Sequence, residues 1–283
     1  MTLSYRPNSN ADVVKLFVLE TDEPHPDTQN EKGSFGEIVF HHFYRASMEH
    51  HPPLGIDVSY QFIVTEKGGS MPSYADFEPF DGLVITGSVY DAYGDNPWIL
   101  QLLDLLKEIW TRRPDFHFTG VCFGHQIIAR LLGAEVRPAP SGDWELGHCA
   151  IDLTPVGQRL FRTRDKRIHL HQMHQDQVVA PPQPETSGGL LTDDTRVEVW
   201  GSSPHTAVQG LYLPNRLFTS QAHLAFDDRM VKRQIEMRVE AGSIKDLEHA
   251  DRAAETAHLE HDGRAVAAAI LRLFVYDDDG MGW

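Results

Sequence analysis

The sequence predicts an α/β fold in which a doubly wound, mostly parallel sheet carries helices on both faces and continues into a small antiparallel extension. Two observations lead to this prediction. Strand-like and helix-like segments alternate through the first half of the chain, which is the order of parallel βαβ units. The strand-like segments there are nearly continuous apolar runs, as in strands buried on both faces, whereas residues after 147 form short strands between Pro and Gly turns.

The first half of the chain supplies the parallel strands and their covering helices. Strands are predicted at 13–19, 56–64, 82–88 and 116–121, helices at 36–50, 97–111 and 126–132, and a polar loop at 21–32. Spacings of three and four residues predict which helical side chains face the core. These are Ile38, Phe43 and Met48 in the first helix, and Leu100, Leu103, Leu106 and Trp110 in the second.

The second half supplies the antiparallel extension, at 147–217, and a charged helical tail, at 229–274. No internal repeat and no linker divides the chain. We therefore expect one domain over residues 1–283, with frayed ends at 1–12 and 276–283.

Composition excludes several classes of function. With 41 acidic and 25 basic residues the formal net charge is −16, so the long-range field repels nucleic acid and anionic membrane surfaces. No apolar run approaches the roughly 20 residues that span a bilayer, and the first 12 residues lack the apolar core of a signal peptide. Two cysteines in 283 residues fit a reducing compartment. We expect a cytoplasmic protein.

The sharpest local signal is Gly120-Val121-Cys122-Phe123-Gly124, at the junction of a predicted strand and a predicted helix. Small residues on both sides of a nucleophile allow the sharp turn that lifts its side chain to the carboxyl edge of a sheet. The N-terminus of the following helix favours a thiolate. The alternative interpretation is a buried core cysteine beside a helix start, which is common.

Acyl chemistry at such a thiol also needs hydrogen-bond donors for an oxyanion. The backbone N–H of Phe123 and that of Gly87 or Ser88, at the tip of the preceding strand, are the natural donors. The sequence thus predicts an oxyanion hole between two strand ends.

Several segments together resemble the class I glutamine amidotransferase family. They are Ile-Thr-Gly-Ser at 85–88, Gly-Val-Cys-Phe-Gly-His-Gln at 120–126, Trp-Glu-Leu-Gly at 144–147, Met-His-Gln-Asp at 173–176 and Gln-Ala-His at 221–223. The resemblance runs from about residue 13 to 227 in the family's order, which makes it far more specific than one motif. It implies a flavodoxin-like fold.

The resemblance is closest to the stand-alone branch, which includes fungal amidotransferase-like proteins and plant γ-glutamyl peptidases. It implies cleavage of a γ-glutamyl amide through a thioester, with Cys122 as nucleophile and His223 as base. It also implies oxyanion donors at Gly87 and Phe123 and a substrate contact at Gln126.

One departure from the family pattern concerns the residue that orients the histidine. The family usually has Gly-His-Pro-Glu at this place, with the glutamate orienting and charging the imidazole. Here the run is Ala222-His223-Leu224-Ala225, so Ala225 replaces the acid. Asp227 is the nearest candidate for a substitute acid.

Three functions follow from that departure. The first is a hydrolase with a Cys122–His223 dyad, which a thiol nucleophile allows. The second is a biosynthetic hydrolase or lyase that uses the same thiol on a small molecule other than glutamine. The third is a pseudoenzyme that binds a ligand or a partner. The residues alone do not choose among them, and the enzyme is the primary interpretation.

Other residues near these motifs are candidates for substrate binding. They are Ser88, Tyr90, Trp144, His174 and Asp176. For each of them loop packing or a hydrogen-bonded turn is the alternative. His125 should point away from Cys122, and Cys149 should serve only in packing.

Histidine is abundant, with 16 residues, and His169 with His171 on one strand face could seat a divalent ion. No cysteine pair or carboxylate motif completes such a site, so the sequence predicts no metal and no cofactor. The expected partner is a small-molecule substrate, with no nucleic acid and no membrane. Nothing in the sequence indicates a synthetase partner or a homo-oligomer.

Overall fold

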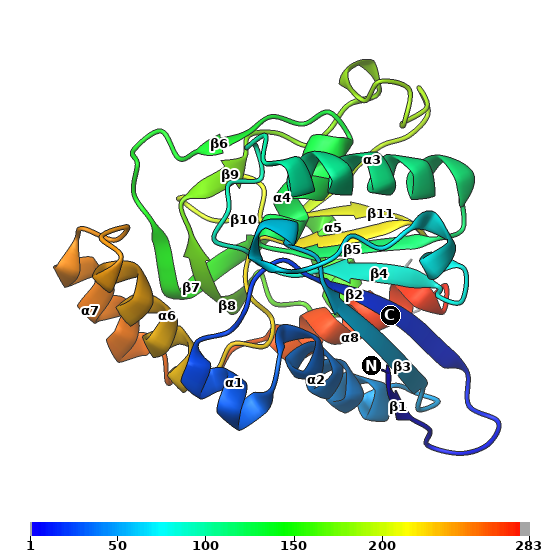
Figure 1. Ribbon diagram of the computed structural model, residues 1–283. Coiled ribbons are helices and arrows are strands. Elements are labelled where there is room, and N and C mark those ends of the chain that lie inside the picture. Colours follow the sequence, from blue (N-terminus) through cyan, green and yellow to red (C-terminus); the bar gives the residue numbers. More distant parts are fainter. Residues whose placement is uncertain (1, 278–283) are drawn as a thin grey trace.

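A computed structural model describes residues 2–277 and places ten strands in one continuous sheet (Figure 1). The strand order is β1-β3-β2-β4-β5-β12-β11-β10-β7-β8. The strands are β1 (Thr2–Tyr5), β2 (Val13–Glu20), β3 (Gly55–Phe62), β4 (Gly82–Ile85), β5 (His117–Val121), β7 (Glu145–Leu153), β8 (Arg167–His174), β10 (Glu198–Ser202), β11 (Gly210–Leu213) and β12 (Leu217–Ser220). A separate pair joins β6 (Val136–Pro138) to β9 (Asp176–Val178).

The parallel part of the sheet consists of β3, β2, β4, β5 and β12, and each neighbouring pair runs in the same direction. Their carboxyl ends therefore meet at one edge, where ligands bind in open α/β sheets. The predicted fold class is confirmed, because helices cover both faces of this mostly parallel region.

The antiparallel extension is larger than the sequence predicts. Strands β11, β10, β7 and β8 continue the same sheet beyond β12, each antiparallel to its neighbour. The long hairpin of β7 and β8 pairs eight residues from each strand. This length is hard to predict because glycine is typical of turns, and Gly147 lies inside β7. The strand continues through Gly147, which has a positive φ of 72°.

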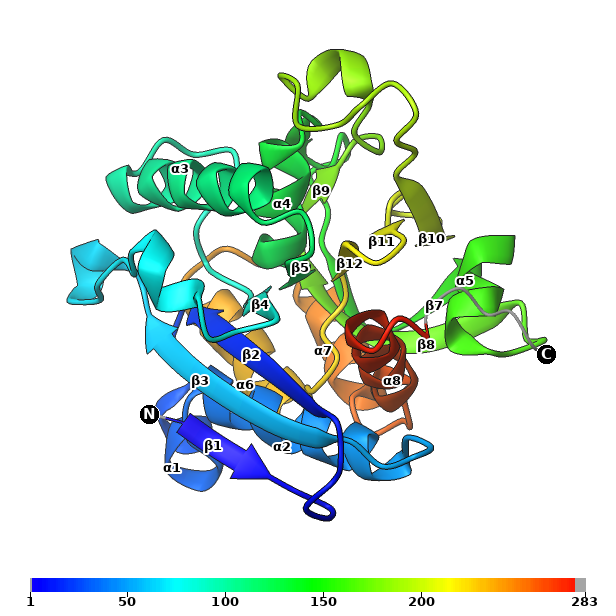
Figure 2. The same ribbon diagram turned by 90° about the vertical axis from the view of Figure 1, so that its right-hand side faces the viewer.

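Helices lie in two layers (Figures 1 and 2). α3 (Pro97–Arg112) and α4 (Phe123–Leu131) cover one face, and α2 (Phe35–Glu49) and α8 (Gly263–Phe274) cover the other. α6 (Asp228–Glu240) and α7 (Leu247–Thr256) pack against β7 and β8. The remaining short helices are α1 (Pro26–Lys32), α5 (Pro155–Phe161) and the 3₁₀ turns η1 (Thr65–Lys67), η2 (Tyr74–Phe77) and η3 (Pro184–Thr186).

Alternation along the parallel strands sends side chains into two separate cores. Phe17 and Leu19 of β2 join the cluster under α3 and α4, whereas Leu16 and Val18 join the cluster under α2 and α8. All four are at most 6% exposed. Burial on both faces explains why the strand reads as a continuous apolar run.

Most of the predicted core positions in α2 and α3 are confirmed, since Ile38, Phe43, Leu106 and Trp110 are at most 7% exposed and Leu103 packs against the core. Met48 is 44% exposed and Leu100 is 42% exposed, although both were expected in the core. Trp98, Ile99 and Leu102 are buried in the core cluster instead. In α3 nearly every turn carries several apolar residues, so the three- and four-residue spacing fits more than one face.

The prediction of frayed ends and of a loop at 21–32 is partly wrong. Thr2–Tyr5 forms β1 and pairs antiparallel with β3, and residues 26–32 form α1, capped by the His25 imidazole accepting from Asp27 N. Asp277 forms an ion pair with Arg162 at 2.6 Å, and the expectation for 278–283 lies outside the described residues. None of the helices within 2–277 has the length and apolar character needed to cross a bilayer.

Candidate active site

Cys122 lies at the turn between β5 and α4, as the sequence predicts. Its backbone has φ 54° and ψ −108°, a strained conformation for a residue with a side chain. Cys122 N donates to Ser220 O at 2.9 Å, which anchors the turn to β12, and Gln126 N donates to Cys122 O, which starts the helix. This is the geometry of a nucleophile elbow.

The two glycines of the elbow are required by close approach of backbone to backbone. A Cβ at Gly120 would overlap Gly124 O and lie 2.8 Å from His125 N. A Cβ at Gly124 would overlap Ile85 O and lie 2.8 Å from Ile85 C. The spacing Gly-x-Cys-x-Gly is therefore a packing requirement of β4, β5 and α4.

The second strand end, after β4, is held against β2 by hydroxyl groups. Thr21 Oγ1 donates to Gly87 O at 2.9 Å, and Ser88 Oγ donates to Thr21 O at 2.7 Å. Ser88 Oγ also accepts from Tyr90 N at 3.2 Å. The Ser88 hydroxyl therefore serves to shape the turn that carries Gly87.

Cys122, His223 and Gly87 meet around one point. A Cβ placed on Gly87 would lie 3.0 Å from His223 Cε1 and 3.5 Å from Cys122 Cβ. The absence of a side chain at Gly87 thus leaves the space between thiol and imidazole open. The structure brings together the predicted nucleophile, base and one oxyanion donor from three different strand ends.

In the part of the chain that the structure describes, no carboxylate bonds to the His223 ring, and other contacts hold it. It stacks on the Phe226 ring, with centroids 3.9 Å apart and planes 13° apart. His223 N donates to His171 O at 2.9 Å, and His223 Nε2 is buried without a hydrogen-bond partner among residues 2–277. Burial lowers the pKa of His223 to about 3, and the positive charge of neighbours such as Arg238 acts in the same direction.

The Cys122 thiol is also buried, with 6% of the residue exposed. Burial raises its pKa to about 12, although hydrogen bonds from Phe123 N–H and the Gln221 side chain favour the thiolate. The N–H at the start of α4 acts in the direction expected from the sequence, but burial acts more strongly in the opposite direction. Desolvation outweighs the donors, so thiol and imidazole are both neutral at pH 7.

Asp227 is not placed to orient His223, which corrects the expectation from the sequence. Its Oδ1 accepts from Met230 N at 3.0 Å as the N-cap of α6, and its Oδ2 pairs with Lys32. Helix capping explains why an aspartate follows this histidine so closely.

Two cavities meet at Cys122. The smaller, of about 190 Å³, contains Gly87 and His223 in its wall, and the larger, of about 1200 Å³, contains Phe123 and Gln126. Cys122 and Ser88 line both. The thiol therefore stands between a compartment beside the imidazole and an open cleft on the α4 side.

The cleft gathers all six predicted substrate-binding residues. These are Ser88, Tyr90, Gln126, Trp144, His174 and Asp176. Several are already engaged in shaping it. Gln126 Nε2 donates to Asp176 O at 2.9 Å, Trp144 Nε1 donates to Ser243 O at 3.2 Å, and the Tyr90 ring packs edge-on against Trp98.

Charges of both signs line the cleft. Burial and the neighbouring Asp91 raise the pKa of Asp176 to about 6. Arg238, from α6, lines both cavities, and its Nε is buried without a hydrogen-bond partner among the described residues. Its guanidinium lies 6.0 Å from the centre of the Trp144 ring. Sequence reasoning missed Arg238 because the charged tail reads as a solvated helix.

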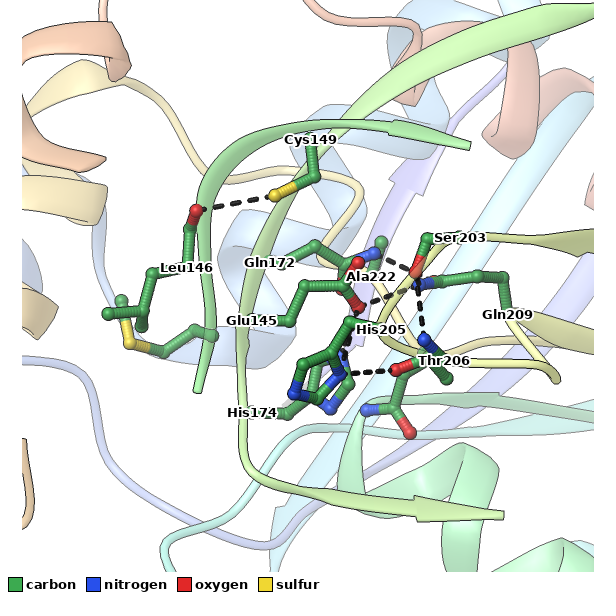
Figure 3. A network of polar contacts seen from close by, with 12 residues as sticks. Glu145, Leu146, Cys149, Gln172, His174, Ser203, His205, Thr206, Gln209 and Ala222 are labelled. Atoms are coloured by element: carbon green, nitrogen blue, oxygen red, sulfur yellow. Dashed lines mark hydrogen bonds and ion pairs between the residues drawn. The ribbon is translucent and has the colours of Figure 1, made fainter. Parts of the chain in front are cut away.

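Figure 3 shows a polar network, of which Glu145, His174 and His205 line the cleft. His174 Nε2 lies 2.9 Å from Glu145 Oε2, which also accepts from Gln209 Nε2 at 2.8 Å. His174 Nδ1 lies 2.9 Å from Asp176 O. Carboxylate and carbonyl oxygens only accept, so both ring nitrogens of His174 lie against acceptors. Burial raises the pKa of Glu145, but the hydrogen bonds and charges of His174, Ser203 and His205 together outweigh burial, and the net shift is downward.

Glu145, His174 and His205 also form the one candidate metal group among residues 2–277, with donor atoms within 4.8 Å of one another. Two histidines and a glutamate suit zinc. Here the atoms are satisfied without an ion. His205 Nδ1 lies 2.9 Å from Thr206 Oγ1, and the His174–Glu145 ion pair is closed. The group therefore reads as a structural ion pair that fixes one wall of the cleft.

The remaining residues weighed from the sequence lie apart from the thiol. His125 is buried, and its Nδ1 lies 2.7 Å from Thr219 Oγ1. The His169 ring stacks on His148 and the His171 ring lies against His261, outside the candidate metal group. Cys149 is partly buried in the wall of the cleft, where its thiol lies 3.3 Å from Leu146 O.

The fold and this geometry define an α/β protein with a strained cysteine at a strand–helix elbow. The profile of the family described as glutamine amidotransferase class-I matches residues 69–224, more than half of the chain. The chain belongs to the class I glutamine amidotransferase family.

Similar proteins agree with this assignment. A Schizosaccharomyces pombe protein described as glutamine amidotransferase-like is 27% identical over 78% of this chain and 83% of its own length. Gamma-glutamyl peptidase 2 of Arabidopsis thaliana is 31% identical over 48% of this chain and 54% of its own length. The crystal structure of a glutamine amidotransferase from Thermotoga maritima shares the fold, with a TM-score of 0.61, 20% identity and coverage of 93% and 98% of the two chains.

Proposed function

We propose that the protein is a cysteine hydrolase that cleaves a γ-glutamyl amide through a thioester. The observation that carries the proposal is the meeting of Cys122, His223 and Gly87 around one open point at the carboxyl edge of the sheet. Membership of the class I glutamine amidotransferase family and the relatives named as γ-glutamyl peptidases support a hydrolase-type role.

In the first step the Cys122 thiol attacks the γ-carbonyl carbon. The S–C bond forms, the proton of the thiol passes to His223, and the carbonyl oxygen becomes an oxyanion. Backbone N–H groups of Phe123 and Gly87 are the candidate donors to that oxygen. The C–N bond then breaks, and His223 returns the proton to the leaving nitrogen.

In the second step water attacks the thioester. The C–O bond forms, the C–S bond breaks, and one proton of the water returns through His223 to the thiol. The products are a free γ-carboxylic acid and an amine. Because thiol and imidazole are both neutral before substrate binds, the proton transfer accompanies attack and no thiolate–imidazolium pair waits in advance. Thiols tolerate the missing carboxylate because they are intrinsically good nucleophiles.

The cleft offers groups that match the two charges at the α-carbon of a γ-glutamyl group. Arg238 supplies a cation for the α-carboxylate. Asp176 and Asp91 supply carboxylates for the α-ammonium, and such a cation would also relieve the repulsion that raises the pKa of Asp176. These charges favour a γ-glutamyl substrate over a neutral acyl compound.

The test is a screen of γ-glutamyl amides, small esters and lactones with the purified protein and its Cys122→Ala variant. We expect release of glutamate from γ-glutamyl amides by the wild type and at least a 1000-fold loss in the variant. Turnover of esters or lactones alone would instead select a repurposed hydrolase. The absence of any turnover, with a Cys122 no more reactive than free cysteine, would select a ligand-binding pseudoenzyme.

A further inference from the structure

The smaller cavity beside Cys122 has a mainly apolar wall. It lies between α2, α6 and the carboxyl ends of β4 and β5, and the side chains that give it this character are Ile38, Val39, Phe43, Phe226 and Met237. Its volume of about 190 Å³ exceeds that of an engineered cavity of about 150 Å³ that holds benzene. A group of roughly six to eight carbon atoms therefore fits by size.

Most ionisable groups in its wall are neutral or paired, and the two exceptions are Glu23, which is exposed, and Arg238, which the proposed function assigns to the α-carboxylate of the γ-glutamyl group. Lys67 pairs with Asp22 at 3.3 Å, and Asp22 Oδ2 also accepts from Val89 N at 3.0 Å. His42 Nε2 lies 3.0 Å from Gly263 O, and burial lowers the pKa of His42 to about 4, so it is neutral at pH 7. With Arg238 engaged by the α-carboxylate of the γ-glutamyl group, a charged or strongly hydrated leaving group would find few free partners there.

The smaller cavity lies on the side of Cys122 that carries His223, the proposed base. His223 and Gly87 line it and do not line the larger cleft, while Cys122 lines both. If the γ-glutamyl group occupies the charged cleft, the atoms beyond the scissile bond lie on the side of the imidazole that protonates them. That side is the apolar cavity.

We propose that this cavity binds the leaving group, so that the preferred substrate is a γ-glutamyl amide of an apolar amine. The inference rests on the proposed function. Ammonia, the leaving group of glutamine, would gain nothing from an apolar wall, and a dipeptide leaving group would bring a carboxylate into it. An alkyl or benzyl amine buries apolar surface there, and each methylene group is worth about a fourfold gain in transition-state binding.

The first experiment measures kcat/KM for a series with one acyl group: glutamine and the γ-glutamyl amides of methylamine, butylamine and benzylamine, with γ-glutamyl-cysteinyl-glycine alongside. kcat/KM reports formation of the thioester, whereas the later hydrolysis is common to all members. We expect a rise of at least 100-fold from glutamine to the benzylamide. Equal or faster turnover of glutamine or the tripeptide would overturn the inference.

A matched pair of variants tests whether the preference for the benzylamide over glutamine arises in the smaller cavity. Met237→Trp fills the cavity, and Glu236→Trp places the same side chain on the exposed neighbouring position of α6. The ratio of benzylamide to glutamine kcat/KM should fall below about tenfold in the first variant and keep its full value in the second. A ratio unchanged in Met237→Trp would place the leaving group elsewhere. Val39→Phe fills the same cavity from α2 and replaces Met237→Trp if that variant fails to fold.

Alkylation of Cys122 gives a readout that needs no hydrolysis. The thiol sulfur displaces iodide from iodoacetamide or N-benzyl-iodoacetamide, and mass spectrometry follows Cys122, with each rate normalised to that of free cysteine. We expect at least tenfold faster reaction of the benzyl reagent, and loss of that preference in Met237→Trp. Equal normalised rates would overturn an apolar site beside the thiol.

Hydrolysis and alkylation together distinguish a failure of the proposed function from a failure of the leaving-group assignment. Hydrolysis of γ-glutamyl amides with no apolar preference would keep the proposed function and overturn the leaving-group assignment. Fast benzyl alkylation with no hydrolysis of any γ-glutamyl amide would overturn the proposed function and the substrate class with it, and would leave only an apolar binding site beside Cys122.

Discussion

At the scale of single residues, the environment of His223 differs from that of a histidine in a catalytic triad. A carboxylate normally fixes the tautomer and stabilises the imidazolium. Here Phe226 supplies a stacked ring at 3.9 Å and His171 O fixes the backbone of His223. These contacts set orientation without lowering the energy of the charged form. The proposed base is therefore well positioned but weak. The oxyanion donors and the binding of the substrate must then supply more of the stabilisation of the transition state.

Asp227→Asn tests whether any carboxylate assists. Asparagine caps helices as well as aspartate does, so the variant removes the charge and keeps the cap. We expect kcat/KM on a γ-glutamyl amide within about twofold of the wild type, with a small loss of stability because the exposed pair with Lys32 is worth at most about 1 kcal/mol. An orienting acid would instead reveal itself by a loss of at least 100-fold.

Gly87→Ala tests the open point between thiol and imidazole. The new Cβ would lie 3.0 Å from His223 Cε1, so the ring must shift and the space for the acyl carbon narrows. We expect a loss of at least 100-fold in kcat/KM. Gly68→Ala is the contrasting control, because Gly68 has a φ of +88° and open space around it. It should cost about 1 kcal/mol of stability through backbone strain and leave activity unchanged. Full activity of Gly87→Ala would contradict the proposed site.

Some residues of the candidate site are predictable from the sequence and others are not, because only some of them belong to a short local motif. Cys122, Gly87 and His223 are found because each belongs to a short motif at a strand end. Arg238 and Phe226 are missed because a helix or a loop brings them to the site, and only the packing of α6 against β8 reveals their neighbours. Asp227 shows the reverse error, a residue assigned to the site that does not act there. Its nearness to His223 in the sequence suggested a contact, whereas its carboxylate caps α6.

At the scale of elements, the elbow depends on how closely β4, β5 and α4 approach. Replacing Gly124 by alanine would push a methyl group into the backbone of Ile85. Rigid strands on both sides cannot yield, so the expected result is a loss of more than ~3 kcal/mol in the free energy of unfolding, as for severe overpacking of a core. Urea unfolding followed by tryptophan fluorescence measures it. A variant as stable as the wild type would mean that α4 shifts freely, and the elbow would not be rigid.

Elements of the parallel half are predictable because burial on both faces leaves continuous apolar runs such as Val13–Glu20. The elements that escaped prediction owe their structure to distant partners. β1 has four residues and pairs with β3, and its Leu3 and Tyr5 pack against the core cluster under α2 and α8. α1 begins at Pro26 in a polar segment, and Glu31, near its end, pairs with Arg233 of α6. The local signals, an alternation over four residues and Pro26 followed by Asp27, are too short to distinguish these elements from loops.

At the scale of the whole molecule, histidines buried without charge couple stability to pH. Burial is the main cause that lowers the pKa of His125 and of His223 to about 3, and it acts in the same direction on His42 and His171. Between pH 6.5 and 4 the unfolded chain binds protons at these positions and the folded chain does not. The free energy of unfolding must therefore fall as pH falls through this window.

Asp176 opposes this trend, and the sign of its effect can be worked out. Burial and Asp91 raise its pKa to about 6, so below pH 6 the folded chain holds a proton there that the unfolded chain binds only near pH 4. This stabilises the fold as pH falls and offsets part of the effect of one histidine. The histidines outnumber it, so a net loss of stability toward pH 5 is expected.

A single variant isolates the histidine contribution. His125 is buried, makes its hydrogen bond through Nδ1 to Thr219 Oγ1 and lies outside the proposed chemistry. Asparagine offers an amide near the position of Nδ1 but does not titrate. Between pH 8 and pH 5 the unfolding free energy of His125→Asn should fall by about 2 kcal/mol less than that of the wild type, the value for one histidine of ordinary pKa in the unfolded chain. Urea titrations at pH 8, 6.5, 5.8 and 5 give both curves. Parallel curves would mean that His125 takes up its proton in the folded state, so that its burial carries no penalty and the acid sensitivity of the fold has another origin.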